Sequence, residues 1–243
     1  MQYYLGRFGF LLRAIFVAGA FACIACPQEG PPEDNSTPAP RTADGHPDFN
    51  GYWKGTKYTK PVGNIAKDLP GLKLPLSAAG AAAFQRNVAA RVDSESRCGI
   101  GGIPRHNASG LPFRIMQNHD HVAFLYLDDF YRMIPTDHRK HPEAPRPSLF
   151  GDEVGYWHDE TFVIDSIGFK AAKVWADERG SPLSDALHIT ELWTRPDADH
   201  IHVYMVIDDP KFYTRKFTYS RTWDAADPAD RVDQYSCTPA PRN

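Results

Sequence analysis

The chain lacks the features that mark several common protein classes. After residue 26 it has no apolar run long enough to cross a bilayer, and its formal net charge of -3 gives no basic surplus for nucleic acid. It contains no Gly-x-Ser-x-Gly nucleophile elbow, no phosphate-binding glycine loop and no dinucleotide fingerprint. These absences argue against a nucleic-acid-binding protein, a serine hydrolase, a nucleotidase and a Rossmann-type oxidoreductase.

The composition is typical of a turn-rich β protein. The 243 residues are 42% hydrophobic and include 21 prolines and 18 glycines. This length is enough for one domain with a hydrophobic core. Many short apolar runs between turn-forming residues favour strands over a helical bundle.

The first 26 residues have the pattern of an export signal. Two arginines precede the apolar run 14–22, which ends on small residues. We expect residues 1–26 to be a signal peptide, or a lipoprotein signal in which Cys23 or Cys26 accepts a lipid and tethers the protein to a membrane. Either signal predicts an exported protein, periplasmic or secreted.

The segment after this signal differs in composition from the rest of the chain. Residues 27–43 are rich in proline and have almost no large apolar side chain, so they cannot form a packed core. We expect a disordered linker there and a single folded domain over residues 44–243.

The domain keeps two cysteines, Cys98 and Cys237. An even pair in an exported protein predicts a disulfide, because an oxidising compartment disfavours a free catalytic thiol. The bridge would close a loop of about 140 residues.

Alternation of apolar and polar residues predicts a first strand and about eight more, joined mostly by hairpin turns. The alanine-rich segment 77–91, with Ser77 as a possible N-cap, is the one good helix. Closure of such a sheet removes its exposed edges. The expected fold is therefore all-β, an antiparallel, lipocalin-like or calycin-like barrel with one short helix, and a β-sandwich is the alternative. The expected strands are 51–56, 113–116, 121–127, 130–134, 155–157, 161–165, 187–194, 201–207 and 213–223.

Several charged residues fall on the apolar faces of these strands. Glu191 shares a face with Trp193, and Arg215 and Arg221 alternate with aromatic residues in the last strand. Arg132 lies between apolar residues in the same way. A buried charge needs a partner or a polar ligand. Three interpretations stay open: a structural Arg–Glu pair, an aromatic-lined pocket for a small molecule, or a bulge that turns the charges outward.

Loop residues beside the strands add acid–base candidates. Asp137, Arg139 and His141 directly follow a strand, and His188 enters another strand. Imidazole near carboxylate at a pocket mouth is suited to proton transfer, since histidine titrates near neutral pH. The same spacings also occur in ordinary surface turns.

Histidine pairs give a weaker indication of a metal site. His119 and His121 lie on one strand face, and His138 is nearby in the sequence. No spacing specific to zinc or copper is present. We therefore expect no metal and no other cofactor, with His119 and His121 as a weak alternative.

Six segments of the domain carry motifs: Asp44-Gly-His-Pro-Asp-Phe-Asn-Gly-Tyr-Trp53, Ile134-Pro-Thr-Asp-His-Arg-Lys-His-Pro142, Gly151-Asp-Glu-Val-Gly-Tyr-Trp157, Thr161-Phe-Val-Ile-Asp-Ser-Ile-Gly-Phe169, Ser184-Asp-Ala-Leu-His-Ile-Thr-Glu191 and Ile207-Asp-Asp-Pro210. Together they resemble a large group of exported bacterial proteins of unestablished function. The resemblance covers nearly all of residues 44–237 and implies export, but no particular activity. Other members have Asp-Gly-Arg at 137–139, which weakens a metal role for the histidines.

The favoured function is cofactor-independent acid–base chemistry on a small, largely apolar or aromatic molecule. An elimination, cyclisation, isomerisation or hydration, as in a lyase, isomerase or hydratase, fits this description. Glu191 is the expected general acid or base, with a pKa raised by burial unless Arg221 keeps it ionised. Arg132 and Arg221 are expected to stabilise developing negative charge.

Further residues are expected around the same substrate. The second acid–base candidates are Asp137, His141 and His188. A non-catalytic small-molecule-binding protein of the periplasm is the alternative function, since small barrels hold single ligands, and a metal-dependent oxidoreductase is the third. The expected substrate contacts are Trp193, Tyr219, Phe217, Tyr204 and Arg139.

Overall fold

The chain divides into two units, residues 1–35 and 36–243. The predicted export signal over 1–26, with Cys23 and Cys26, lies outside the described residues, as does the linker up to residue 35. All described residues belong to the second unit. In the computed structural model they are residues 36–56, 63–91, 93, 95–127, 130–171, 174–227 and 237–238.

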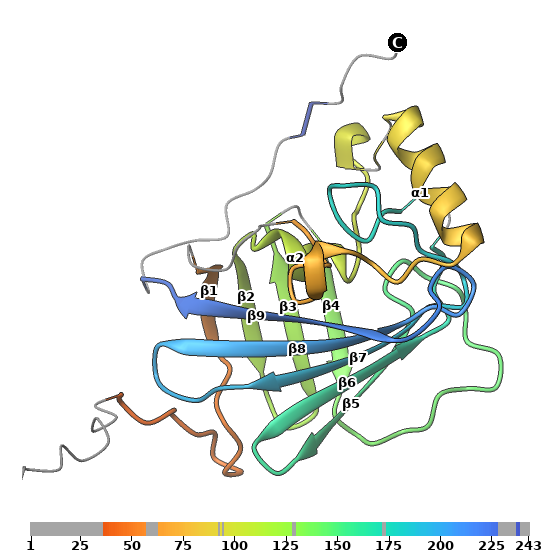
Figure 1. The fold of residues 1–243 in the computed structure, drawn as a ribbon. Helices are drawn as coiled ribbons and strands as arrows, with labels where there is room; N and C mark the ends of the chain where they lie inside the picture. Colours follow the sequence, from red (N-terminus) through yellow and green to blue (C-terminus); the bar gives the residue numbers. More distant parts are fainter. Residues whose placement is uncertain are drawn as a thin grey trace, which may run out of the picture. The chain divides into compact units, whose positions relative to one another are not determined.

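The described strands form one antiparallel sheet that curls into a nearly closed barrel (Figure 1). Its order is β4-β3-β2-β1-β9-β8-β7-β6-β5. A single sheet confirms the predicted all-β, barrel-like fold and excludes a sandwich of two sheets. The strands are β1 (Gly51–Gly55), β2 (Phe113–Gln117), β3 (His121–Tyr126), β4 (Tyr131–Pro135), β5 (Asp152–His158), β6 (Thr161–Ile167), β7 (His188–Thr194), β8 (His200–Asp208) and β9 (Phe217–Ala225).

The two ends of this strand order, β4 and β5, meet at a seam without a described hydrogen-bonded ladder. The strands still approach closely, because a Cβ on Gly155 would lie 2.8 Å from the carbonyl oxygen of Pro135. Across the seam, Nε of Arg132 donates to Oε1 of Glu153 at 2.6 Å. A side-chain ion pair therefore joins the strands where backbone pairing is missing.

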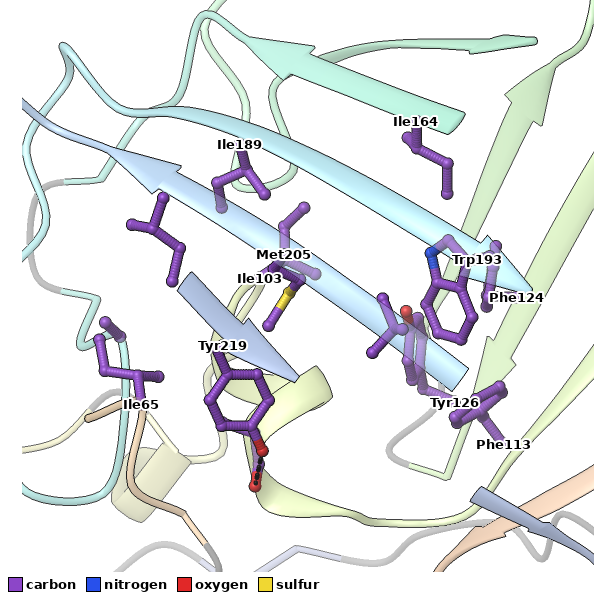
Figure 2. Close-up of a cluster of buried hydrophobic side chains, with 14 of the residues drawn as sticks. Ile65, Ile103, Phe113, Phe124, Tyr126, Ile164, Ile189, Trp193, Met205 and Tyr219 are labelled. Atoms are coloured by element: carbon purple, nitrogen blue, oxygen red, sulfur yellow. Dashed lines mark hydrogen bonds between the residues drawn. The ribbon is translucent and has the colours of Figure 1, made fainter. Parts of the chain in front are cut away.

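The inward face of the sheet carries the aromatic core that the alternation predicts. Figure 2 shows Trp193, Phe113, Phe124 and Tyr126 gathered on one side of the interior. The rings of Phe124 and Trp193 are 5.0 Å apart, and those of Phe113 and Tyr126 are 5.7 Å apart. In both β7 and β9 every second residue is buried, as a strand with one face toward a core requires.

Short helices accompany the sheet. In α1 (Ala78–Ala90), the side-chain oxygen of Ser77 accepts a hydrogen bond from the backbone N–H of Gly80 at 3.1 Å, which confirms the predicted helix and its cap. Figure 1 shows α1 outside the sheet. The five-residue α2 (Arg105–Ser109) is buried over its first four residues. No helix in the described ranges is both long and apolar enough to cross a membrane.

The folded unit begins before the expected boundary at residue 44. The carbonyl oxygen of Thr37 accepts a hydrogen bond from the backbone N–H of Ala198 at 2.8 Å, and Arg41 pairs with Glu160 at 2.7 Å. These contacts attach residues 37–41 to the barrel, so the described end of the expected linker belongs to the folded unit.

Cys98 and Cys237 form the predicted disulfide, with their Cα atoms 5.7 Å apart. The bridge joins the segment before α2 to the segment after β9, at a sequence separation of 139. Such a long loop is where a crosslink restricts the unfolded chain most.

Candidate functional site

A buried ion-pair cluster lies inside the barrel beside the seam. Nη2 of Arg132 donates to Oε1 of Glu191 at 2.5 Å, and Nη1 donates to Oε2 at 3.3 Å. Neither side chain has exposed surface. The same guanidinium lies 2.6 Å from Oε1 of Glu153. One cation thus faces two carboxylates, so the cluster has a net charge of −1 when both are ionised.

Neutral groups complete the surroundings of Glu191. Its Oε2 accepts hydrogen bonds from the amide of Asn107 at 2.8 Å and from the indole N–H of Trp193 at 3.1 Å. Arg132 also donates to the hydroxyl of Tyr126 at 3.2 Å. Buried charges are stable only when paired and hydrogen-bonded in this way. The arrangement favours the structural Arg–Glu interpretation for Glu191.

Glu153 is the proton-binding member of this cluster. Burial raises its pKa to about 7, against an ordinary value of 4.5. Arg132 opposes this shift, whereas the carboxylates of Glu191 and Asp152 add to it. For Arg132, the two carboxylates outweigh burial and raise its pKa. The cluster therefore takes up a proton near neutral pH, which removes its excess negative charge.

Arg221 does not pair with Glu191, the partner expected from the sequence. Its Nη1 donates to the carbonyl oxygen of Ala108 in α2 at 2.8 Å and to the hydroxyl of Tyr219 at 3.3 Å. The guanidinium packs directly on Gly110, where a Cβ would lie 1.7 Å from Nη2. Arg221 therefore holds α2 against the strands and does not set the charge of Glu191.

The remaining expected strand-face residues divide between the core and the surface. Trp193, Phe217 and Tyr219 are buried, whereas Tyr204 is on the outside and 44% exposed. Arg215 is exposed because β9 begins only at Phe217. The expectation that Arg215 lies among the inward aromatic residues is therefore wrong.

A second cluster lies on the outward face of β5, β6 and β7, and we call it the rim cluster. It consists of Arg139, Asp152, His141, Asp165 and His188, in that order of contact. Asp152 accepts two hydrogen bonds from Arg139, at 2.9 and 3.0 Å, and contacts Nδ1 of His141 at 2.6 Å. Asp165 contacts Nε2 of His141 at 3.0 Å and Nε2 of His188 at 2.7 Å. The fold thus brings together three of the residues predicted from the loops.

Strand register explains how these distant residues meet. Asp165 of β6 lies directly opposite Thr190 of β7, and Thr190 donates to its Oδ1 at 3.1 Å. His188 is two residues before Thr190, so it projects from the same face. Asp165 therefore lies between His188 of the neighbouring strand β7 and His141 of the loop after β4.

The rim contacts determine the protonation preferences of their members. Burial alone would raise the pKa of Asp165, but hydrogen bonds from His188, His141 and Thr190 outweigh burial and lower it. The hydrogen bond to Asp165 raises the pKa of His188 against the opposing effect of burial. For Asp152 as well, contacts with Arg139 and His141 outweigh burial and lower the pKa. The geometry favours anionic carboxylates beside a readily protonated His188.

His188 differs from His141 in its exposure and in having one ring nitrogen available to an outside molecule. Both ring nitrogens of His141 contact carboxylates, and its side chain is 18% exposed. The side chain of His188 is 40% exposed, and within the described chain its Nδ1 has no hydrogen-bond partner. His188 is therefore the imidazole of the rim cluster that is placed to exchange a proton with an outside molecule.

The other loop candidates have local contacts. Asp137 accepts a hydrogen bond from the backbone N–H of Arg139 at 3.2 Å, which is a turn contact. His119 lies 3.2 Å from Asp120 and is mostly exposed, and His121 begins β3. Among the described residues, no group of three or more His, Cys, Asp or Glu side chains is arranged to hold a metal ion.

Sequence reasoning missed four residues that the structure places in these clusters. Asp152 and Glu153 were missed because the expected strand began at residue 155, whereas β5 begins at Asp152. Alternation extended back from Tyr156 would have placed them on opposite faces. Asp165 was assigned to a strand but to no role, and Asn107 lies between the expected helix 77–91 and the expected strand 113–116.

No family model matches the chain, and comparisons with curated proteins and with solved structures find no match. The resemblance to exported bacterial proteins therefore stays a prediction.

Proposed function

We propose that this protein transfers protons to and from a small organic molecule at the rim cluster, with His188 as the general acid–base group. The observation that carries the proposal is the geometry of Asp165. Its two oxygens contact His141 and His188, and this leaves Nδ1 of the exposed His188 open. A carboxylate on one ring nitrogen fixes the imidazole and stabilises its protonated form, while the other nitrogen acts on a substrate.

Each member of the cluster has a role in this chemistry. In an isomerisation, His188 removes a proton from one substrate atom and returns it to another. The product then has the same atoms as the substrate. Asp165 stabilises the imidazolium that forms in between. His141 and Asp152 are positioning residues, because His141 contacts Asp165 and Asp152 contacts the other ring nitrogen of His141. Arg139 anchors Asp152 through two hydrogen bonds.

The neighbouring outward residues support a largely apolar or aromatic substrate. Tyr156 is partly exposed on the outward face of β5, two residues beyond Val154, which lies opposite Asp165 and is itself buried. The ring of Tyr156 is 5.4 Å from that of His138. Apolar surface beside a few directed polar groups is the usual composition of a small-molecule site.

The proposal predicts that His188→Gln lowers turnover by about 100-fold or more. Wild-type and variant proteins are incubated with a bacterial small-molecule extract in D2O, and mass spectrometry detects compounds that gain deuterium or change mass. We expect at least one compound to react with the wild type. With His188→Gln its reaction rate should fall by at least about 100-fold, because a positioned acid–base group accelerates a reaction by about 10²- to 10⁴-fold.

His200→Gln is the matched control. His200 also contacts a carboxylate, that of Asp197 at 2.9 Å, and its side chain is 44% exposed, but it lies outside the rim cluster. Its substitution is expected to leave the rate unchanged. Full activity of His188→Gln, or no compound that reacts with the wild type, would contradict the proposal.

A further inference from the structure

A hollow lies on the outer surface over β2, β3 and β4, and none of its lining residues belongs to either cluster. Its volume is about 510 Å³, which is within the usual range for small-ligand sites. It is lined by Asn50, Met116, Gln117, Asn118, His121, Ala123, Leu125, Tyr131 and Met133.

The strand register explains why the sheet is hollowed there. Met116 of β2, Ala123 of β3 and Met133 of β4 lie side by side in one row. The small side chain of Ala123 therefore forms a floor between two long thioethers. In the next row, Leu125 lies beside Tyr131, so one side of the hollow has an aromatic ring.

The walls of this hollow are apolar and exposed. Met116 is 56% exposed, Met133 57% and Tyr131 66%. Large apolar residues gathered around one depression mark a binding surface more often than scattered ones do. Thioether sulfurs are polarizable and make favourable contacts with aromatic rings, so the chemistry of the walls favours a planar aromatic ligand.

The polar side chains around the hollow differ in whether they are free to bind a ligand. The side chains of Asn50, Gln117 and Asn118 make hydrogen bonds that hold the neighbouring loop segments. Arg114, by contrast, lies on the same outward face, opposite Leu125, and is exposed. Among the described residues, its guanidinium has no hydrogen-bonding or ion-pair partner. A cation at this end of the apolar surface complements an acidic group.

We propose that this hollow binds a planar aromatic molecule with an acidic substituent. The ring lies between Met116 and Met133 over Ala123, and the acidic group faces Arg114. A second copy of the chain is disfavoured as the occupant, because a stable interface buries about 800 Å² on each partner. Three exposed apolar residues around one hollow offer far less. The site is separate from the rim cluster and does not depend on the function proposed there.

NMR of methionine methyl groups labelled with ¹³C tests this site, with 2-naphthoate as the probe. Met116 and Met133 report on the hollow, and Met205, which is fully buried in the core, is the internal reference. We expect saturable shifts of the Met116 and Met133 signals and no shift of Met205. Ala123→Leu fills the floor and is expected to weaken binding about tenfold or more, while the unchanged Met205 signal shows that the core is intact.

Arg114→Gln separates the charge contribution from the apolar one. It is expected to weaken binding of 2-naphthoate several-fold and to leave binding of the uncharged 2-naphthalenemethanol unchanged. Absence of saturable shifts, or shifts of all three signals together, would overturn the proposal. Shifts of Met116 and Met133 with protein concentration alone would also overturn it, because they would identify a second copy of the chain as the occupant.

Discussion

Arg132→Met is expected to lower the free energy of unfolding by about 3–5 kcal/mol at pH 8. Methionine fills a similar volume but leaves Glu191 and Glu153 buried without their shared cation. Breaking a buried ion pair by removing one partner costs this much, because an uncompensated charge stays in the core. Urea denaturation followed by tryptophan fluorescence measures the change.

Two comparisons separate this effect from a general loss of packing. Arg215→Met removes an exposed arginine that lies two residues before β9. It is expected to change the free energy of unfolding by no more than about 0.5 kcal/mol. Replacing Glu153 and Glu191 by glutamine in the Arg132→Met background is expected to restore much of the loss, since no buried charge remains. A loss under 1 kcal/mol in Arg132→Met would contradict the structural role of the cluster.

Glu153→Gln is expected to make the protein more stable than the wild type above neutral pH. The pKa of Glu153 is about 7 in the folded protein and 4.5 ordinarily. Between these values, the folded state binds a proton that the unfolded state has released. Wild-type stability therefore falls as pH rises from about 4.5 to about 7, by about 3 kcal/mol in total from this group. Glutamine does not titrate, so the variant lacks this loss.

The measurement is the difference in unfolding free energy between Glu153→Gln and the wild type at several pH values. We expect little difference near about pH 3, where Glu153 is protonated in both states, and a gain of about 3 kcal/mol for the variant at pH 8. Glu160→Gln is the control, because Glu160 is an exposed carboxylate that pairs with Arg41 outside the core. A difference that does not depend on pH would show that Glu153 is not a buried proton-binding group.

The sequence predicted the interior of this barrel better than its rim. Alternation correctly placed Glu191, Arg132 and Arg221 on inward faces, because each lies within a strand whose register is fixed by the apolar residues on the same face. Alternation failed for Arg215, because the alternating pattern in the sequence begins before the strand itself does. Strand ends are set by loop contacts, and alternation does not report them.

Partner choice was the second limit. Both Arg132 and Arg221 face inward, and the sequence gives no reason for Glu191 to bind one of them. Which arginine pairs with Glu191 depends on the seam, where β4 meets β5. It also depends on α2, because a carbonyl oxygen of α2 accepts a hydrogen bond from Arg221. Both features are contacts between segments far apart in the chain.

The rim cluster was visible only in part for the same reason. Proximity to strand ends identified His141, Arg139 and His188 as candidates, and the structure brings them together. Asp165 looked like the ordinary polar end of a strand. Its importance comes from lying between two imidazoles, and that depends on the pairing of β6 with β7 and on the path of the loop after β4.

The pKa of His188, measured by NMR of the imidazole in the wild type and in Asp165→Asn, tests most directly whether Asp165 holds His188 as a proton-transfer group. We predict a wild-type pKa above the ordinary 6.5, because the hydrogen bond to Asp165 favours the protonated ring. In Asp165→Asn the carboxylate charge is gone while burial remains, so the pKa falls below that of the wild type. The same pKa in both proteins would contradict the dyad and the function proposed from it.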